Sequence, residues 1–345
     1  MSSGGSGGRP VVVTVGEGLL RLTPPDASPL PGATSLRVHV GGAEANVAAG
    51  LSTLGVPARW FSRVALGPTG EALLRPLAAL GVDVGSVLRA PGRTGLYFVE
   101  DGAGVRPTRV TYDRAGSTFA GLAPEHLTDP VLDRIFERAG WLHLTGIDLA
   151  VADAPLAALE RLWSAARRRA VRRSFDVNVR TTLPEADRLG QRAAAYLGSA
   201  DLVFVAERDV HALALPHARS GASEANPDAL LERLATAGPD ATWVLTRGVH
   251  GAAARAPDGA FAARPSLPAS GPGRIGRGDA FAAGFLSVWS DRSEIDPGPD
   301  DRLARALAYG VAAASFKASS PGDLPDLDPV HVASLADGAA ATLER

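Results

Sequence analysis

Short apolar runs recur along this chain and alternate with longer segments of helical periodicity. The runs are rich in β-branched or aromatic residues and end in turn residues, so they predict buried strands. They are Val11 to Val15, Arg59 to Leu66, Val82 to Leu88, Trp141 to Gly146, Ser174 to Arg180, Leu202 to Val205 and Thr242 to Thr246. The alternation predicts an α/β fold: a mostly parallel sheet with helices on both faces and a ligand site at the carboxyl ends of the strands.

A glycine turn precedes one of the predicted helices. It reads Gly273-Arg274-Ile275-Gly276-Arg277-Gly278-Asp279 and continues into an apolar, alanine-rich stretch. Glycines let the backbone approach a ligand closely, and the free N–H groups at a helix start favour an anion such as phosphate. A carboxylate at this place has two explanations. Asp279 either caps the helix or takes a proton from a hydroxyl that attacks phosphorus, and the stretch alone favours neither.

Composition and charge exclude several classes of function. The formal net charge is −2, which gives no general attraction for nucleic acid. The arginine cluster from Arg167 to Arg173 is short and lies at a predicted helix C-terminus, where cations are favoured. The chain has no cysteine, which excludes disulfides and thiolate metal sites, and its seven histidines lack ligand spacing. No run predicts a membrane span. Residues 1–10 predict a disordered tail and no signal peptide, so we expect a cytoplasmic protein.

Four separated motifs together resemble those of the ribokinase-like (PfkB) carbohydrate kinases. They are the Gly276 to Gly284 stretch, the helix start Gly41-Gly42-Ala43-Glu44-Ala45-Asn46, the pair Thr94 to Phe98 with Tyr112-Asp113-Arg114, and Asp176-Val177-Asn178-Val179-Arg180. The 2-keto-3-deoxygluconate kinase branch is the most similar. The resemblance covers nearly the whole chain after the tail. It implies a ribokinase-like domain over residues 11–345, with a small β lid formed by about 17–40 and 93–115.

The same resemblance implies a kinase that uses ATP and Mg²⁺ to phosphorylate a sugar acid. Asp279 would act as the general base, and the N–H groups of Gly276, Arg277 and Gly278 would form the anion hole. The residues implied for the sugar acid are Gly41, Gly42, Asn46, Tyr97, Tyr112, Arg114, Asn178 and Arg180. Those implied for the nucleotide are Thr246, Gly248, Gly251, Gly276, Gly278 and Asp323. On a strand, Asp176, Asn178 and Arg180 would share one face.

Several positions depart from the family pattern, among them Arg274, Ile275 and Arg277 of the glycine turn. Gly273 stands where the family has a carboxylate, and Ala206 and Asp209 replace the Asn and Glu that organise magnesium. These changes should loosen Mg-ATP. One hypothesis is that Arg274 and Arg277 replace part of the metal's positive charge. Another is that Arg277 fills the phosphate site and leaves a weak kinase or none.

Three functions therefore stay open at this stage. The chain is a sugar-acid kinase, a kinase-shaped binder of sugar acids, or a kinase for another acceptor such as a nucleoside or a sugar of specialised metabolism. The retained Asp279 speaks against a pure binder, because a binder needs no base. The partners expected are a small-molecule sugar or sugar acid, with no nucleic acid and no membrane, and a homodimer through the lid is a further expectation.

Overall fold

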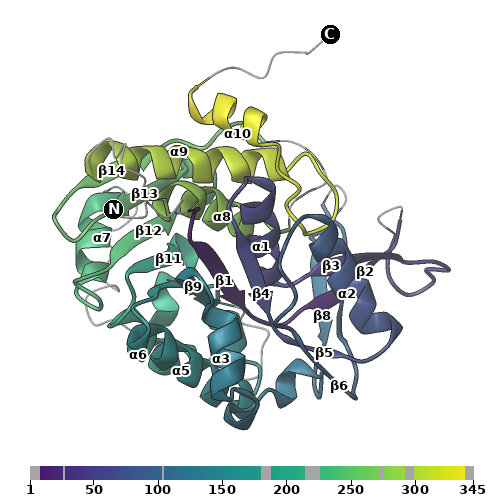
Figure 1. Ribbon diagram of the computed structural model, residues 1–345. Helices are drawn as coiled ribbons and strands as arrows, with labels where there is room; N and C mark the ends of the chain where they lie inside the picture. The colour runs from purple at the N-terminus through teal and green to yellow at the C-terminus, as the bar shows by residue number, and fades with distance from the viewer. Residues whose placement is uncertain are drawn as a thin grey trace.

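A mostly parallel sheet forms the centre of the molecule (Figure 1). The computed structural model describes residues 8–25, 28–102, 105–179, 188–213, 226–269, 271, 273, 275–291 and 299–338. Within them the large sheet has the strand order β14-β13-β12-β11-β10-β9-β1-β4. The strands from β12 to β4 run parallel, while β13 and β14 add an antiparallel hairpin at one edge. The predicted fold class is confirmed.

Six strands of the large sheet coincide with predicted apolar runs, although the predicted strand Arg59 to Leu66 divides into β4 and the separate strand β5 (Arg63–Ala65). The strands of this sheet are β1 (Val11–Val15), β4 (Ala58–Phe61), β9 (Ala139–Thr145), β10 (Arg172–Asp176), β11 (Leu202–Ala206), β12 (Thr242–Thr246), β13 (Ala252–Arg255) and β14 (Phe261–Arg264). The central strands are buried on both faces, which explains why they read as continuous apolar runs.

Helices cover both faces of this sheet and create two separate cores. Val11, Val13 and Val15 of β1 pack in one core, and Val12 packs in the other. The first core contains α3 (Asp129–Phe136), α5 (Asp153–Arg168), α6 (Leu189–Leu197) and α7 (Pro227–Ala235). The second contains α1 (Ala43–Thr53), α2 (Pro68–Ala79), α8 (Arg277–Trp289) and α9 (Pro299–Lys317). The two-residue period of a strand thus sends alternate side chains to opposite cores.

Smaller elements complete the fold. α10 (Pro329–Ala336) packs on α9, and α4 (Gly146–Leu149) follows β9 directly. The short strands β5 (Arg63–Ala65) and β6 (Leu88–Ala90) form a parallel pair. Single turns of 3₁₀-helix lie at Phe119–Gly121, Pro124–His126 and Gly248–His250, and a longer one at Glu207–Leu213. Within the described residues, no helix is both long and apolar enough to cross a membrane.

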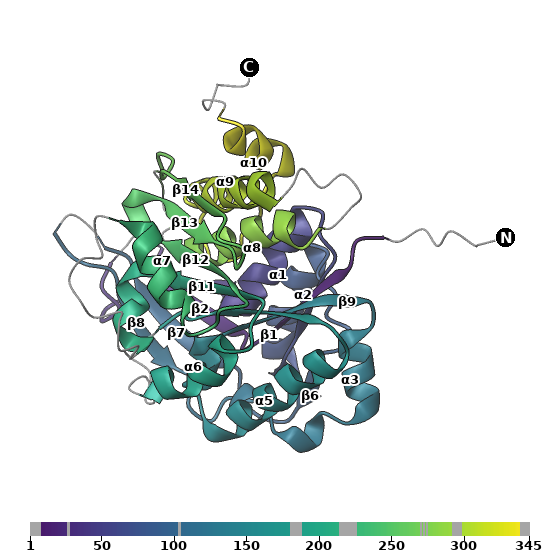
Figure 2. The same ribbon diagram turned by 90° about the vertical axis from the view of Figure 1, so that its left-hand side faces the viewer.

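A second sheet, which we call the small sheet, stands apart from the large one. Its order is β3-β2-β7-β8, with β2 (Leu19–Thr23), β3 (Arg37–Gly41), β7 (Gly95–Glu100) and β8 (Arg109–Asp113). Its strands come from the two segments, 17–40 and 93–115, that the sequence assigned to a lid. Figure 2 shows the small sheet beside the carboxyl-end side of the large sheet. Its action as a lid and its role in a dimer remain predictions.

One predicted strand is wrong. Val82 to Leu88 forms a turn, in which Asp83 makes an isolated bridge with Arg59 and strand β6 begins only at Leu88. The Asp83 carboxylate explains the turn, because Oδ1 accepts a hydrogen bond from the Gly85 N–H at 2.9 Å and Oδ2 accepts one from Arg59 Nε at 2.7 Å. Aspartate side chains that bond to the backbone two residues later favour turns over strands.

The predicted strand from Ser174 to Arg180 is also shorter than expected. β10 ends at Asp176, and Asn178 has a φ of 38°, which lies outside the strand region. The Asp176 carboxylate accepts a hydrogen bond from the Asn178 N–H at 3.2 Å, which turns the chain after the strand. The expectation that Asp176, Asn178 and Arg180 share a strand face is therefore wrong for the first two, and Arg180 lies outside the described residues.

Substitution of Gly284 by valine should destabilise the fold. A Cβ atom at Gly284 of α8 would lie 2.4 Å from the Tyr309 carbonyl oxygen and 2.7 Å from Ala313 Cβ, both in α9. Overpacking of this kind costs about 1–3 kcal/mol, so thermal unfolding followed by circular dichroism should shift down by several degrees. Gly278→Ala in the same helix is the control for stability, because nothing lies within 4 Å of its Cβ position. Equal unfolding temperatures for Gly284→Val and wild type would contradict the packing.

Candidate active site

A cavity of about 1200 Å³ opens at the carboxyl ends of the parallel strands, between the small sheet and the start of α8. Most of the predicted site residues line it: Gly42, Asn46, Tyr97, Tyr112, Asn178, Thr246, Gly248, Gly251, Gly276, Arg277, Gly278, Asp279 and Asp323. Gly41 and Arg114 are not among the lining residues, and Arg180 lies outside the described part of the chain. The fold thus brings together positions that are far apart in the sequence.

The N-terminus of α8 points its free N–H groups into this cavity. Gly276 is the N-cap residue and has a left-handed φ of 81°, which suits glycine. A Cβ at Gly276 would lie 2.4 Å from the Asp323 carbonyl oxygen, so the turn packs directly on that backbone. Asp279 is two residues beyond the first helical residue, Arg277, and so is not the N-cap of α8. The capping explanation for Asp279 is therefore wrong.

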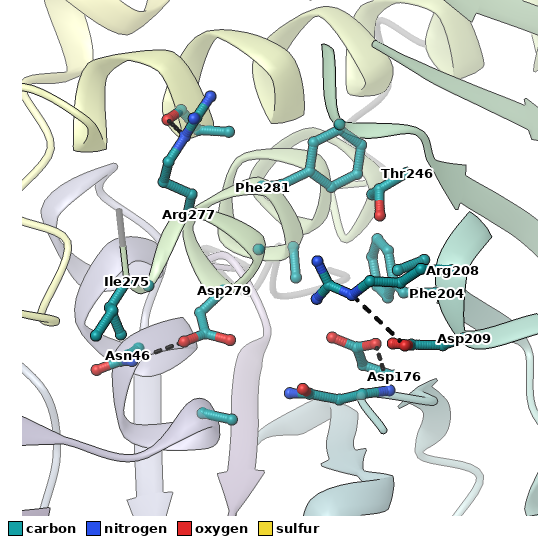
Figure 3. Close-up of a pocket in the computed structure, with 18 of the residues that line it drawn as sticks. Asn46, Asp176, Phe204, Arg208, Asp209, Thr246, Ile275, Arg277, Asp279 and Phe281 are labelled. Carbon is teal, nitrogen blue, oxygen red and sulfur yellow. Dashed lines mark hydrogen bonds and ion pairs between the residues drawn. The ribbon is translucent and has the colours of Figure 1, made fainter. Parts of the chain in front are cut away.

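The Asp279 carboxylate is held by Asn46 of α1. Asn46 Nδ2 donates a hydrogen bond of 2.6 Å to Asp279 Oδ2, and the two residues are 2% and 9% exposed (Figure 3). An ionised carboxylate only accepts hydrogen bonds, so the amide must present its NH₂ group here. Asn46 Oδ1 is buried and has no hydrogen-bond partner among the described residues. Asn46 therefore orients Asp279 and keeps an acceptor atom for a further group.

Arg277 does not fill the space in front of the helix. Its Nε donates a hydrogen bond of 3.1 Å to the Ala314 carbonyl oxygen of α9. Figure 3 shows its side chain directed away from Asp279. The hypothesis that the Arg277 guanidinium plugs the phosphate site finds no support in this geometry, and neither does the hypothesis that this guanidinium replaces the charge of a metal. Arg274, its companion in that hypothesis, lies outside the described residues.

Two tyrosines of the small sheet form the opposite wall. Tyr97 and Tyr112 stack with their ring centroids 5.8 Å apart. The Tyr97 hydroxyl donates a short hydrogen bond to Asp323 Oδ2, and Asp323 Oδ1 accepts one of 2.8 Å from Arg21. Burial, with the nearby Asp323 charge, raises the pKa of Tyr97 well above its usual value, so the phenol stays neutral. The Asp323 carboxylate, which the sequence assigned to the nucleotide, thus joins Tyr97 to Arg21.

Arg114 lies in a buried charge cluster beneath this wall. Its Nε donates a hydrogen bond of 2.7 Å to Glu17 Oε2, and its Nη2 lies 3.7 Å from Asp148 Oδ1. Glu44 completes the cluster and accepts a hydrogen bond of 2.6 Å from the Thr145 hydroxyl. All four charged residues of the cluster are nearly inaccessible to solvent. Whether Arg114 also reaches a sugar acid remains a prediction.

The ends of β10, β11 and β12 supply the remaining wall, which contains residues that sequence reasoning missed. Asp176, Glu207, Arg208 and Arg247 line the cavity together with Asp209. Arg247 Nε donates to Glu207 Oε1 at 3.2 Å, and Arg208 Nε lies 3.5 Å from Asp209 Oδ1. The available signal was their position, because residues that directly follow parallel strands surround the ligand site.

The buried cluster predicts a pH dependence of stability. Burial raises the pKa of Asp148 from 3.8 to about 7, although the Arg114 charge acts in the opposite direction, and burial with the Asp148 charge raises the pKa of Glu44. Between the unfolded and folded pKa values the folded protein binds more protons than the unfolded chain, so stability should fall as the pH rises from about 4 to 7. Asp148→Asn cannot ionise and should lose less stability over this range.

Urea unfolding of wild type and Asp148→Asn at several pH values measures this difference. Asp153→Asn is the control, because the Asp153 side chain is 91% exposed. It should show the wild-type slope. Parallel stability curves for wild type and Asp148→Asn would show that Asp148 does not gain a proton on folding.

Comparisons with known proteins agree with this site. A family model described as pfkB family carbohydrate kinase matches residues 10–328. The 2-dehydro-3-deoxygalactonokinase of Haloferax volcanii is 31% identical over 336 residues, covering 97% of this chain and 99% of that protein. The 2-dehydro-3-deoxygluconokinase of Thermoproteus tenax is 28% identical, with 90% and 89% covered. The crystal structure of 2-dehydro-3-deoxygluconokinase from Thermotoga maritima gives a TM-score of 0.81 at 26% identity and covers 96% of this chain and 99% of that chain.

The matched segment contains both sheets, the cavity and all of the helix α8 that carries Asp279. The chain therefore belongs to the pfkB family of carbohydrate kinases and is a phosphotransferase that acts on a sugar or a sugar derivative.

Proposed function

We propose that this protein transfers the γ-phosphoryl group of ATP to a hydroxyl of a 2-keto-3-deoxy (2-dehydro-3-deoxy) sugar acid. The observation that carries the proposal is the position of Asp279 in the first turn of α8, oriented by Asn46 and facing a cavity of substrate size. The names of two similar relatives, both kinases of such acids, support the acceptor class.

Asp279 acts as the general base in this proposal. A sugar hydroxyl has a pKa far above that of a carboxylate, so Asp279 accepts the proton only as the bond to phosphorus forms and the hydroxyl becomes acidic. Asn46 holds one carboxylate oxygen and so fixes the direction in which the group meets the acceptor hydroxyl. The reaction therefore depends on the direction of the carboxylate.

The start of α8 stabilises the transferred group. The N–H groups of Gly276, Arg277 and Gly278 have no partners within the helix, and the positive end of the helix dipole lies at the same place. They hold the negative charge on the phosphoryl oxygens in the transition state. Since Gly278 has no atom within 4 Å of its Cβ position, the phosphoryl group can come close to the backbone there.

The sugar acid lies against the small sheet in this proposal. Tyr97 and Tyr112 provide an aromatic wall, and Gly42 lets the backbone come close. A Cβ at Gly41 would lie 2.8 Å from Asp323 Oδ2 and closer still to the Tyr97 hydroxyl, so this glycine is needed for the wall itself. Asn178, Arg114 and Arg180 are the proposed polar and cationic contacts of the acid.

The nucleotide lies on the other side of α8, near Thr246, Gly248 and Gly251. Kinases hold Mg²⁺ with one or two carboxylates and the phosphate oxygens of the nucleotide, and the bound ion neutralises phosphate charge. Among the described residues, no group of three or more His, Cys, Asp or Glu side chains could hold a metal ion. Asp176 and Asp209 line the cavity, and their carboxylates would be the one or two that hold the ion together with the nucleotide phosphates.

A coupled assay for ADP release tests the proposal. The acceptors are 2-keto-3-deoxygluconate, its 4-epimer 2-keto-3-deoxygalactonate, neutral hexoses and nucleosides. Turnover confined to the two acids is the expected result. Turnover of a neutral sugar or a nucleoside would show that the proposed acceptor class is wrong. Tight binding of an acid with no turnover of any acceptor would indicate a kinase-shaped binder.

Asp279→Asn should lower kcat by about 10²–10⁴-fold, because the amide keeps the shape of the carboxylate but cannot accept the proton. The KM values for acid and ATP should change little, since the amide still fits the site. Asp133→Asn is the control. It removes the same charge from a side chain of α3 that is 71% exposed, and it should leave kcat unaltered. A kcat of Asp279→Asn within threefold of wild type would remove the general base from the mechanism.

A further inference from the structure

Three arginines among the described residues line the cavity, and two of them are engaged by the protein. Arg277 donates to the Ala314 carbonyl, and Arg247 donates to the Glu207 carboxylate and is only 15% exposed. The third, Arg208, is 75% exposed at its side chain. Its nearest acidic atom is Asp209 Oδ1, at 3.5 Å from Nε, and its two terminal nitrogens have no protein partner in the described parts of the chain.

The position of Arg208 is set by the fold. β11 ends at Ala206, and Arg208 lies in the 3₁₀ segment that follows directly. In Figure 3 its guanidinium extends into the cavity, toward the side where Asp279 lies and below Thr246. A side chain that is highly exposed and yet lines a cavity is accessible to whatever the cavity binds.

The lining of the cavity contains several carboxylates, which the Arg208 guanidinium partly offsets. Asp176, Glu207, Asp209, Asp279 and Asp323 all line the cavity. A polyphosphate chain would meet this negative lining and needs positive charge close to it. The only lysine of the chain, Lys317, is fully buried, and its Nζ donates to the Ser320 and Gly322 carbonyl oxygens at 3.1 and 3.0 Å. Lys317 therefore cannot provide this charge.

We propose that Arg208 binds the phosphate chain of the nucleoside triphosphate and supplies positive charge at the ends of β11 and β12. A guanidinium contacts two phosphate oxygens at once, which gives both affinity and orientation. The pair with Asp209 is long, at 3.5 Å, and the Arg208 side chain is 75% exposed although Asp209 is buried, so the guanidinium can turn from the carboxylate to a phosphate group. The inference rests on the proposed function. It assigns to Arg208 the role that sequence reasoning gave to Arg274 and Arg277.

Binding of metal-free ATP, measured by titration calorimetry in EDTA, tests this contact without turnover. Arg208→Ala should weaken ATP binding about 10-fold. Arg208→Lys keeps the positive charge but loses the paired donors of the guanidinium, so its ATP affinity should lie between those of Arg208→Ala and wild type. Arg75→Ala removes the same charge at an 82% exposed side chain of α2 and should bind ATP like wild type.

Adenosine, which carries no phosphate, is the second probe. Its affinity should be equal in wild type and Arg208→Ala, because the contact is to phosphate. Equal ATP affinities for wild type and Arg208→Ala, a parallel loss for adenosine, or no binding of metal-free ATP to wild type would each overturn the inference. Absent turnover in wild type together with Arg208-dependent ATP binding would reject the proposed function and support this contact.

Discussion

The start of α8 is the structural element on which the site depends. Its direction is set by close packing on two other helices. Gly284 of α8 leaves room for the Tyr309 carbonyl of α9, and a Cβ at Gly50 of α1 would lie 2.8 Å from Ala283 Cβ. Small residues at these contacts allow the helices to approach closely, so the free N–H groups of α8 reach the cavity while its apolar face stays in the core.

The contact between Asn46 and Asp279 joins this helix to the other side of the cavity. α1 follows β3 of the small sheet directly, and β3 ends at Gly41. A movement of the small sheet would therefore displace Asn46 and, through it, the Asp279 carboxylate. The bonds from Tyr97 and Arg21 to Asp323 provide a second connection, because the Gly276 turn packs on the Asp323 backbone. Both connections join the small sheet to the start of α8.

The tertiary structure explains why the position of Gly273 carries no side chain. A side chain at Gly273 would come within 2.3 Å of the Lys317 carbonyl and 2.4 Å of the Ser320 carbonyl. The loop after α9 occupies that space, held by the buried ammonium group of Lys317. Among the described residues, Arg208 is the exposed arginine of the cavity, whereas Arg277 of the glycine turn is bonded to the Ala314 carbonyl.

The sequence by itself determined the alternation of strands and helices, the glycine turn with Asp279 and six strands of the large sheet, because these follow from local periodicity and backbone freedom. It failed where one hydrogen bond outweighs an apolar run, as at Asp83 and at Asp176 with Asn178. Only the tertiary structure decided that Arg277 turns away and Arg208 faces the cavity. The direction of a long side chain depends on which acceptor its neighbours in space offer, here the Ala314 carbonyl, and no local pattern records that choice.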